Sequence, residues 1–311
     1  MASQIERDAM GRAIALSALG LGATSPNPPV GCVILDAAGH IAGQGYHQRK
    51  GEPHAETYAL AAAGSRAEGG TGIVTLEPCN HHGRTPPCHQ ALIDAHIARV
   101  VIALIDPTSR GEGGGAKLRM AGIDVEVGVL ANEARLVLGP WLNSLKTGRP
   151  HLTWAYVHSD DGPAPALGST SPLIAADARL LRTHNDAVLY TGGEVEEGVP
   201  NSHGAGMLNL SSKPLTDDPT TVLAVLYAAG VRSVLLSGGR SLAEPFVQAE
   251  LVNRIVVYFA VEGPSTSPRS PDISWSLLPS GFEIATITRQ NMHVKITGIP
   301  SGGVSATGSS T

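Results

Sequence analysis

The chain has 311 residues, of which 42% are hydrophobic and 16% charged, and its formal net charge is −5. This length suits two domains of about 150 residues each, and the acidic balance gives no general attraction to nucleic acid or to anionic membranes. The N-terminus lacks the apolar core of a secretory signal, no run of about 18 apolar residues predicts a membrane span, and three cysteines are too few for a disulfide framework. A reducing cytoplasm, where thiols are free to bind metal, is the expected compartment.

Helical and strand-like patterns alternate along the first half of the chain. A proline-rich loop at 25–29 separates the first helix from the first strand. The spacing of apolar residues predicts helices over 4–20, 54–66, 86–98, 116–122 and 131–148, and strands over 30–36, 40–47, 72–78, 99–106 and 124–129. This alternation predicts an α/β layer structure.

A second alternation of strands and helices follows the segment Thr-Gly-Arg-Pro at 147–150. The pattern predicts strands over 151–158, 186–193, 233–239 and 254–261, and helices over 170–184, 217–230 and 241–252, the first of these with an N-cap at Thr170 or Ser171. A loop is expected at 262–272, and the Gly/Ser/Thr-rich tail is expected to be disordered. We therefore predict domains at 1–148 and 149–300, followed by a tail at 301–311.

Three short segments of the first half carry metal-binding side chains. His54 begins a predicted helix, Cys79 follows the end of a predicted strand, and Cys88 opens the next helix. A catalytic zinc ion has three protein ligands and leaves a fourth position for water, whose pKa falls toward 7. The pattern therefore predicts a catalytic zinc site with His54, Cys79 and Cys88 as ligands.

Glu56, two residues after the histidine, is the candidate proton carrier. Zinc deaminases of nucleobases combine H-x-E with P-C-x-x-C, and their glutamate acts as general acid and base. The chain matches the first part and departs in the second, because eight residues separate Cys79 from Cys88. The alternatives are a structural zinc site, for which only His81 or His82 would supply a fourth ligand, or no metal at all. We interpret those two histidines as loop or pocket residues and Cys32 as a core residue.

The motifs HAE, EPCNHHGRTPPC and PNPPVGCVI resemble the riboflavin-biosynthesis deaminase–reductase family, in which the same eight-residue insertion occurs. The resemblance covers residues 1–150 and implies a cytidine-deaminase-like α/β/α domain. It implies that 2,5-diamino-6-(5-phosphoribosylamino)pyrimidin-4(3H)-one is deaminated to 5-amino-6-(5-phosphoribosylamino)uracil. The family's zinc ligands match His54, Cys79 and Cys88, and its proton shuttle matches Glu56.

The same resemblance implies a substrate pocket. The family's pocket asparagine matches Asn27, and a histidine before the HAE segment matches His47. Arg84 and Thr85 match the basic residue and threonine before the second cysteine, and Arg84 is the candidate for holding the substrate phosphate. The alternative for Asn27 is a turn residue beside proline, and for the other three it is a solvated loop residue.

The second half resembles the family's reductase domain, which has a dihydrofolate-reductase-like α/β fold and uses NADPH. Arg182 matches a residue that contacts substrate in the family. Ser237, Gly238 and Gly239 follow a strand and precede a helix, where backbone N–H groups can bind cofactor phosphates.

The reductase-like half departs from the family at several positions. Ala155 replaces a lysine and Ser237 a glutamate; Pro163 follows Asp-Gly in place of a basic residue, and Gly168 stands near the place of a tryptophan. An aspartate-rich block is replaced by a segment from Gly192 with glutamates at 194, 196 and 197, which would repel cofactor phosphates. Two interpretations stay open: an NADPH-dependent reductase, or a domain that only supports dimerisation or stability.

We therefore expect a cytoplasmic zinc hydrolase of riboflavin biosynthesis that acts on a small molecule and forms a homo-oligomer. Neither nucleic acid nor membrane is an expected partner. A deaminase of tRNA bases is the first alternative, but it needs a basic surface, and the chain has only 22 lysines and arginines. A scaffold with structural zinc is the second, and it has no use for Glu56.

Overall fold

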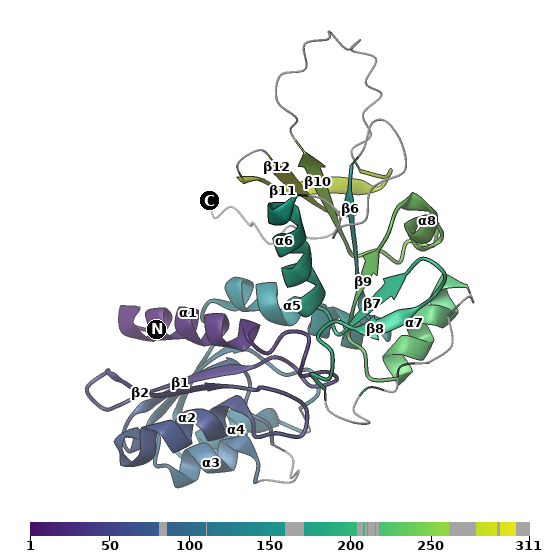
Figure 1. The fold of residues 1–311 in the computed structure, drawn as a ribbon. Coiled ribbons are helices and arrows are strands. Elements are labelled where there is room, and N and C mark those ends of the chain that lie inside the picture. The colour runs from purple at the N-terminus through teal and green to yellow at the C-terminus, as the bar shows by residue number, and fades with distance from the viewer. Residues whose placement is uncertain are drawn as a thin grey trace. The chain divides into compact units, whose positions relative to one another are not determined.

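The computed structural model describes residues 1–80, 86–109, 111–158, 171–203, 208, 210, 215, 218–260, 278–290 and 293–302. The chain separates into two compact units (Figure 1). Unit 1 comprises 1–142 and a short segment that begins at Ser202, and unit 2 comprises 143–201 and the residues from Leu208 onward. No helix in these described ranges is long and apolar enough to cross a membrane.

Unit 1 is built on a five-stranded sheet with the order β2-β1-β3-β4-β5. β1 runs antiparallel to both of its neighbours, whereas β3, β4 and β5 are parallel. The strands are β1 (Gly31–Leu35), β2 (Ile41–Tyr46), β3 (Thr71–Leu76), β4 (Arg99–Leu104) and β5 (Asp124–Val127). The helices are α1 (Gln4–Ala18), α2 (Ala55–Ala63), α3 (Cys88–Asp94), α4 (Gly113–Met120) and the first part of α5 (Ala131–Thr147), with a 3₁₀ turn η1 (Gly64–Ala67).

Helices cover both faces of this sheet. α1 packs on β1 and β3 from one side (Figure 1). On the other side, apolar side chains of α2, α3 and α4 form a core with those of β1, β3 and β4, and Cys32 is fully buried there as predicted. The result is the α/β/α arrangement expected from the sequence.

Glycines allow α2 to pack directly against β2. A Cβ at Gly43 would overlap the carbonyl oxygen of Ala59, and a Cβ at Gly45 would come within 2.5 Å of the Cβ of Tyr58. Ala59 is buried at this contact. Because backbone meets backbone here, the N-terminal end of α2, which carries His54 and Glu56, has a fixed height above the sheet.

Unit 2 is built on a seven-stranded sheet with the order β11-β12-β10-β6-β9-β7-β8. β10, β6, β9 and β7 are parallel, and the three outer strands are antiparallel to their neighbours. The strands are β6 (His151–Val157), β7 (Ala187–Tyr190), β8 (Val195–Glu197), β9 (Ser233–Ser237), β10 (Arg254–Ala260), β11 (Phe282–Gln290) and β12 (His293–Pro300). The helices are α6 (Pro172–Thr183), α7 (Pro219–Ala228) and α8 (Arg240–Gln248).

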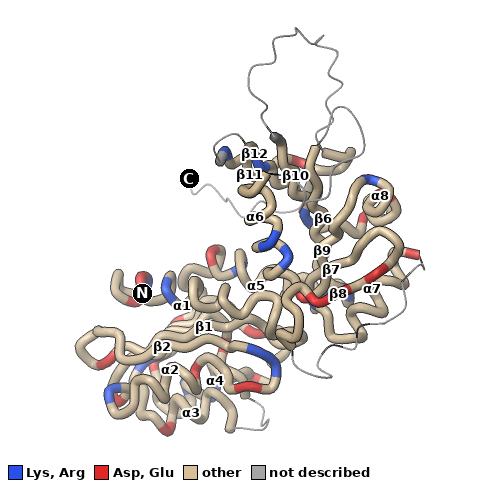
Figure 2. Tube along the Cα trace, in the orientation of Figure 1, with Lys and Arg blue, Asp and Glu red and all other residues tan. Residues whose placement is uncertain are grey.

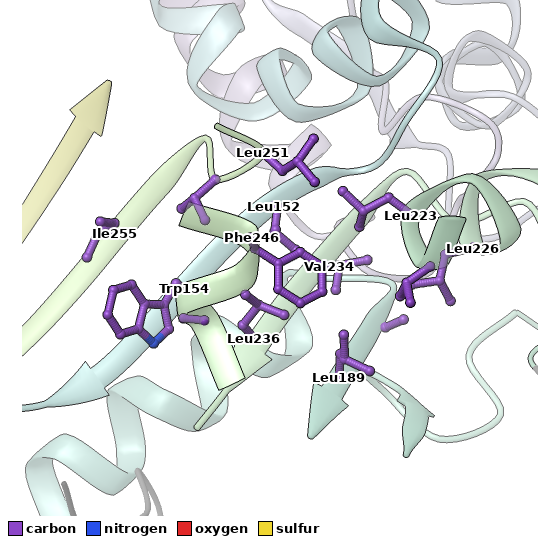
Figure 3. Close-up of a cluster of buried hydrophobic side chains, with 14 of the residues drawn as sticks. Leu152, Trp154, Leu189, Leu223, Leu226, Val234, Leu236, Phe246, Leu251 and Ile255 are labelled. Atoms are coloured by element: carbon purple, nitrogen blue, oxygen red, sulfur yellow. The ribbon is translucent and has the colours of Figure 1, made fainter. Parts of the chain in front are cut away.

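Alternate residues of β6 serve two separate cores. Leu152 and Trp154 join the larger core with α7 and α8, which Figure 3 shows around Phe246. Ala155 faces the opposite side and belongs to a smaller core with α6. Helices therefore cover both faces of this sheet as well.

The predicted helices and strands are present, with ends that shift by a few residues. Ser171 is the N-cap of α6, because its side chain accepts a hydrogen bond from the Ile174 amide. β8, β11 and β12 had no counterpart in the sequence prediction. β8 has only three residues, two of them glutamates, and β11 is exposed along almost its whole length, so neither presents the one-sided apolar pattern of a core strand.

Candidate functional site

The three predicted zinc ligands lie together in unit 1. One ligand atom from each of His54, Cys79 and Cys88 falls within 4.8 Å of the others. Nδ1 of His54 is 3.2 Å from Sγ of Cys88 and 3.7 Å from Sγ of Cys79. Tetrahedral zinc with ordinary Zn–S and Zn–N bonds separates such atoms by about 3.5 Å. The donor set therefore fits a zinc ion with three protein ligands.

Each ligand is positioned by the end of a secondary-structure element. His54 is the N-cap of α2 with extended backbone angles, and it leaves the capping role of its side chain unused. Cys88 is the first residue of α3, and its backbone N–H points at Sγ of Cys79 over 3.3 Å. Cys79 lies in the turn after β3. The sheet and two helix ends thus bring together residues that are far apart in the sequence.

The electrostatics of the two cysteines favour one thiolate even before metal is considered. The pKa of Cys79 is lowered to about 4, chiefly by its hydrogen bond with Cys88 and then by that with His54. The pKa of Cys88 is raised, chiefly by the same hydrogen bond with Cys79. The pair thus shares one proton, and binding of zinc would displace it, since zinc binds the thiolate form.

Glu56 lies in the first turn of α2 and is only 3% exposed. Burial raises the pKa of its carboxyl group, and the nearby charge of His54 partly opposes this rise. A raised pKa brings a buried carboxyl closer to neutral pH, which favours both the acceptance and the return of a proton. Its position beside the ligands is the one required of a proton carrier.

His47 connects the loop of Asn27 to the segment that precedes the first ligand. Its ring is 2% exposed, and desolvation lowers its pKa. Nδ1 lies 3.0 Å from the carbonyl oxygen of Pro53, so Nδ1 carries the proton and donates. Nε2 then accepts from Nδ2 of Asn27 over 3.2 Å. The ring also meets that of His54 edge to face, with centroids 5.3 Å apart.

A tryptophan that belongs to none of the sequence motifs supports this loop. Nε1 of Trp141, on α5, donates to the carbonyl oxygen of Pro26 over 3.0 Å. The backbone N–H group of Asn27 donates to the carbonyl oxygen of Thr24 over 2.9 Å. Nothing in the sequence near Trp141 signals this contact, which joins residues 115 positions apart.

Four residues of the predicted pocket lie outside the described part of the chain. They are His81, His82, Arg84 and Thr85. The structure therefore brings together the three ligands, Glu56, and the pair formed by Asn27 and His47.

Arg182 lies in unit 2, where its guanidinium group is bound by the hairpin of β7 and β8. Nε donates to the carbonyl oxygen of Gly198 over 3.1 Å, and Nη1 contacts the hydroxyl of Tyr190. Nη2 lies 2.9 Å from Oε2 of Glu196 and 3.1 Å from the carbonyl oxygen of Glu197. All three guanidinium nitrogens are thus engaged within the unit.

The segment from Ser237 to Gly239 joins β9 to α8. The carbonyl oxygen of Gly238 accepts from Nε1 of Trp154 over 3.0 Å, and a Cβ at Gly238 would come within 2.8 Å of Leu242. A larger residue at position 238 would therefore displace the end of the Leu242 side chain. Gly239 is the N-cap of α8 and has open space where a Cβ would lie, which leaves the helix N-terminus accessible.

This segment alone does not complete a site for NADPH. Ala155 contributes a fully buried methyl group to the core under α6, and the cation of Arg182 is neutralised by Glu196. At positions 155 and 182, the described part of unit 2 therefore offers no free cation for the phosphates of NADPH, and we derive no reduction step from these two residues.

Comparison with known proteins gives a family match for each half of the chain. Residues 3–104 match the model of the cytidine and deoxycytidylate deaminase zinc-binding region, and residues 129–261 match that of the RibD C-terminal domain. The riboflavin biosynthesis protein RibD of Mycobacterium tuberculosis is 38% identical over 297 residues, which cover 84% of this chain and 87% of that protein. RibD of Escherichia coli is 47% identical over 192 residues, which cover 60% of this chain and 52% of that protein.

Solved structures agree with this assignment. RibD of Acinetobacter baumannii is 28% identical with a TM-score of 0.73, and the match covers 96% of this chain and 99% of that one. The diaminohydroxyphosphoribosylaminopyrimidine deaminase/5-amino-6-(5-phosphoribosylamino)uracil reductase of Thermotoga maritima is 26% identical with a TM-score of 0.75, and the match covers 95% of this chain and 99% of that one. The first half is a zinc-binding deaminase domain and the second is the family's reductase domain, which in RibD is NADPH-dependent. The chain belongs to the RibD family of riboflavin-biosynthesis proteins.

Proposed function

We propose that this chain removes the 2-amino group of 2,5-diamino-6-(5-phosphoribosylamino)pyrimidin-4(3H)-one. Water is consumed, and the products are ammonia and 5-amino-6-(5-phosphoribosylamino)uracil. The observation that carries the proposal is the convergence of His54, Cys79 and Cys88 within 4.8 Å beside the buried Glu56. The name of the Thermotoga maritima relative supports this choice of substrate.

His54, Cys79 and Cys88 would hold the zinc ion, which when bound lowers the pKa of a coordinated water toward 7 and so makes hydroxide available. The carboxylate of Glu56 takes a proton from the attacking water. It delivers this proton to the ring nitrogen next to the reacting carbon and later assists protonation of the departing amine. The raised pKa of Glu56 suits these transfers, since a proton carrier works best when its pKa is near the working pH.

Asn27 and His47 orient the heterocycle in this proposal. Because Nδ2 of Asn27 donates to His47, the side-chain oxygen Oδ1 of Asn27 is available to accept a hydrogen bond from an N–H group of the substrate heterocycle. The resemblance to the family supports Arg84 as the residue that holds the substrate phosphate and Thr85 as a further substrate contact. Arg182 and residues 237–239 match substrate and cofactor contacts of the family's second half, but these matches alone carry no reduction step here.

We assign the second domain a supporting role rather than a reduction step. The contacts of Arg182 and the apolar surroundings of Ala155 favour this choice. The domain limits that we propose are 1–148 and 149–300, with a tail at 301–311 of which 303–311 lie outside the described residues. A homo-oligomer that works in the cytoplasm completes the proposal, although one relative from Arabidopsis thaliana, 46% identical over 259 residues, is named as chloroplastic.

A tRNA base as substrate is the competing possibility. Along the described elements of unit 1, lysines and arginines are interspersed with acidic residues rather than gathered (Figure 2). This distribution favours a small molecule over a nucleic acid.

The test is an ammonia-release assay of the zinc-loaded full chain. The diaminopyrimidine ribosyl phosphate should be deaminated, while unmodified tRNA should release no ammonia. Ammonia from tRNA but not from the pyrimidine would overturn the substrate assignment.

A further inference from the structure

Glu77 is a buried carboxylate that no step above uses. It is 6% exposed and directly follows β3, two residues before the proposed ligand Cys79. Oε1 accepts from the amide of Gly115 over 2.9 Å. Oε2 accepts from Oγ of Ser109 over 3.0 Å and, at longer range, from the amide of Asp106 over 3.4 Å. One side chain therefore ties the end of β3 to the segment between β4 and α4.

The first turn of α4 is shaped to receive this carboxylate. Gly113, Gly114 and Gly115 open the helix and are buried. A Cβ at Gly113 would overlap the carboxylate of Glu77, and Gly113 has a positive φ of 78°. A Cβ at Gly114 would overlap the carbonyl oxygen of Pro78. The three glycines thus let the helix N-terminus, where negative charge is stabilised, approach the strand end directly.

The backbone from Glu77 to Cys79, which follows β3, is held by hydrogen bonds at two further points. The amide of Glu77 donates to the carbonyl oxygen of Leu104 over 2.8 Å, which extends the pairing of β3 with β4. The carbonyl oxygen of Cys79 lies 3.0 Å from Nδ1 of His89 and 3.3 Å from its amide. The backbone between these points has little freedom, so its anchors decide where Sγ of Cys79 lies.

We infer that Glu77 is a positioning residue of the zinc centre: through the N-terminus of α4 it fixes Cys79 at the distance from His54 and Cys88 that zinc requires. This inference rests on the zinc ligation proposed above, but not on the identity of the substrate. Outer residues that orient metal ligands typically change metal affinity 10- to 100-fold when they are replaced.

Glu77→Gln is the test variant, because it keeps the shape of the side chain and places an amide N–H₂ group opposite donors that need an acceptor. Glu6→Gln is the matched control. Glu6 is also a buried carboxylate of unit 1, 9% exposed, and it accepts from the amide of Ser3 and from Nε of Arg99, each over 2.7 Å. Both variants lose a bound carboxylate, but only Glu77 adjoins a ligand.

Zinc dissociation is measured on the full chain by chelator competition, and the cobalt-substituted protein is compared by its visible absorption. We expect Glu77→Gln to raise the dissociation constant about tenfold or more and to alter the cobalt spectrum. Glu6→Gln should lower thermal stability but keep both metal readouts. The inference would be overturned if Glu77→Gln had the wild-type zinc dissociation constant and cobalt spectrum. It would also be overturned if the two variants lost zinc affinity equally.

Two further variants keep the test decisive. If Glu77→Gln does not fold, Ser109→Ala removes one of the three hydrogen bonds and should raise the zinc dissociation constant by a smaller factor; an unchanged constant would contradict the role of Glu77. His54→Ala should abolish tight metal binding. If it does not, the proposed zinc ligation fails, and this failure is distinct from that of Glu77.

Discussion

Nε2 of His47 lies 3.2 Å from Nδ2 of Asn27, although the two residues are 20 positions apart. The opposite nitrogen of the same ring is bound to the carbonyl oxygen of Pro53, the residue before the first zinc ligand. In the proposed function, this imidazole therefore determines that the side-chain oxygen of Asn27, rather than its nitrogen, faces the substrate.

Asn27→Asp tests this arrangement. The carboxylate has the same shape but cannot donate to Nε2 of His47, so an acceptor would face an acceptor. We expect kcat/KM for deamination to fall about 100-fold, equivalent to about 2.7 kcal/mol of transition-state stabilisation. Ammonia release is measured together with zinc content, which should stay at the wild-type level. An unchanged kcat/KM in this variant would show that Asn27 does not bind the substrate heterocycle.

Glu56→Gln tests the proton carrier. The amide retains the size of the side chain but cannot accept the proton of water, so we expect kcat to fall by about 10²- to 10⁴-fold. Zinc content measured by atomic absorption should not change. Loss of zinc in this variant would instead indicate that Glu56 is a metal ligand.

The pH dependence of deamination follows from the same residue. Glu56 must start as a carboxylate, so kcat/KM should decline as the pH falls through its folded-state pKa, which burial raises above 4.5. Since the folded state holds this proton more tightly than the unfolded state, ionised Glu56 lowers stability above that pKa. Glu56→Gln should therefore make the metal-free protein more stable at neutral pH. A rate that stays constant down to pH 4.5 with zinc still bound would contradict the raised pKa.

Arg182→Ala tests the second domain. The ion pair with Glu196 is partly exposed, since 28% of the Arg182 side chain and 61% of the Glu196 side chain are accessible. Solvent screening therefore limits how much the pair stabilises the fold. With the lost bonds to backbone carbonyls, we expect unfolding free energy to fall by about 1 kcal/mol in urea titrations. Ammonia release should be unchanged. A loss of deamination in the folded variant would place Arg182 in the deaminase reaction.

The candidate zinc ligands could be selected from the sequence because short motifs contain them. His54 and Glu56 lie at a helix start, and Cys79 and Cys88 lie at the ends of a strand and a loop, positions that local patterns reveal. The structure adds only the fact that the three ligand atoms meet within 4.8 Å.

The supporting contacts were not predictable, because they depend on packing between distant segments. Ser109 reaches Glu77 across 32 positions, and Trp141 reaches Pro26 across 115. No local pattern distinguishes these residues from ordinary core or loop residues. The contacts of Arg182 have the same origin: its helix was predicted, but β8, whose backbone and Glu196 bind it, was not.

The most direct test of the account follows ammonia release and nicotinamide absorbance together in one reaction. It contains the zinc-loaded full chain, the diaminopyrimidine ribosyl phosphate and NADPH. We predict ammonia in proportion to the substrate added, and constant nicotinamide absorbance. The absence of ammonia would contradict the deaminase assignment, and consumption of NADPH after ammonia release would contradict the supporting role of the second domain.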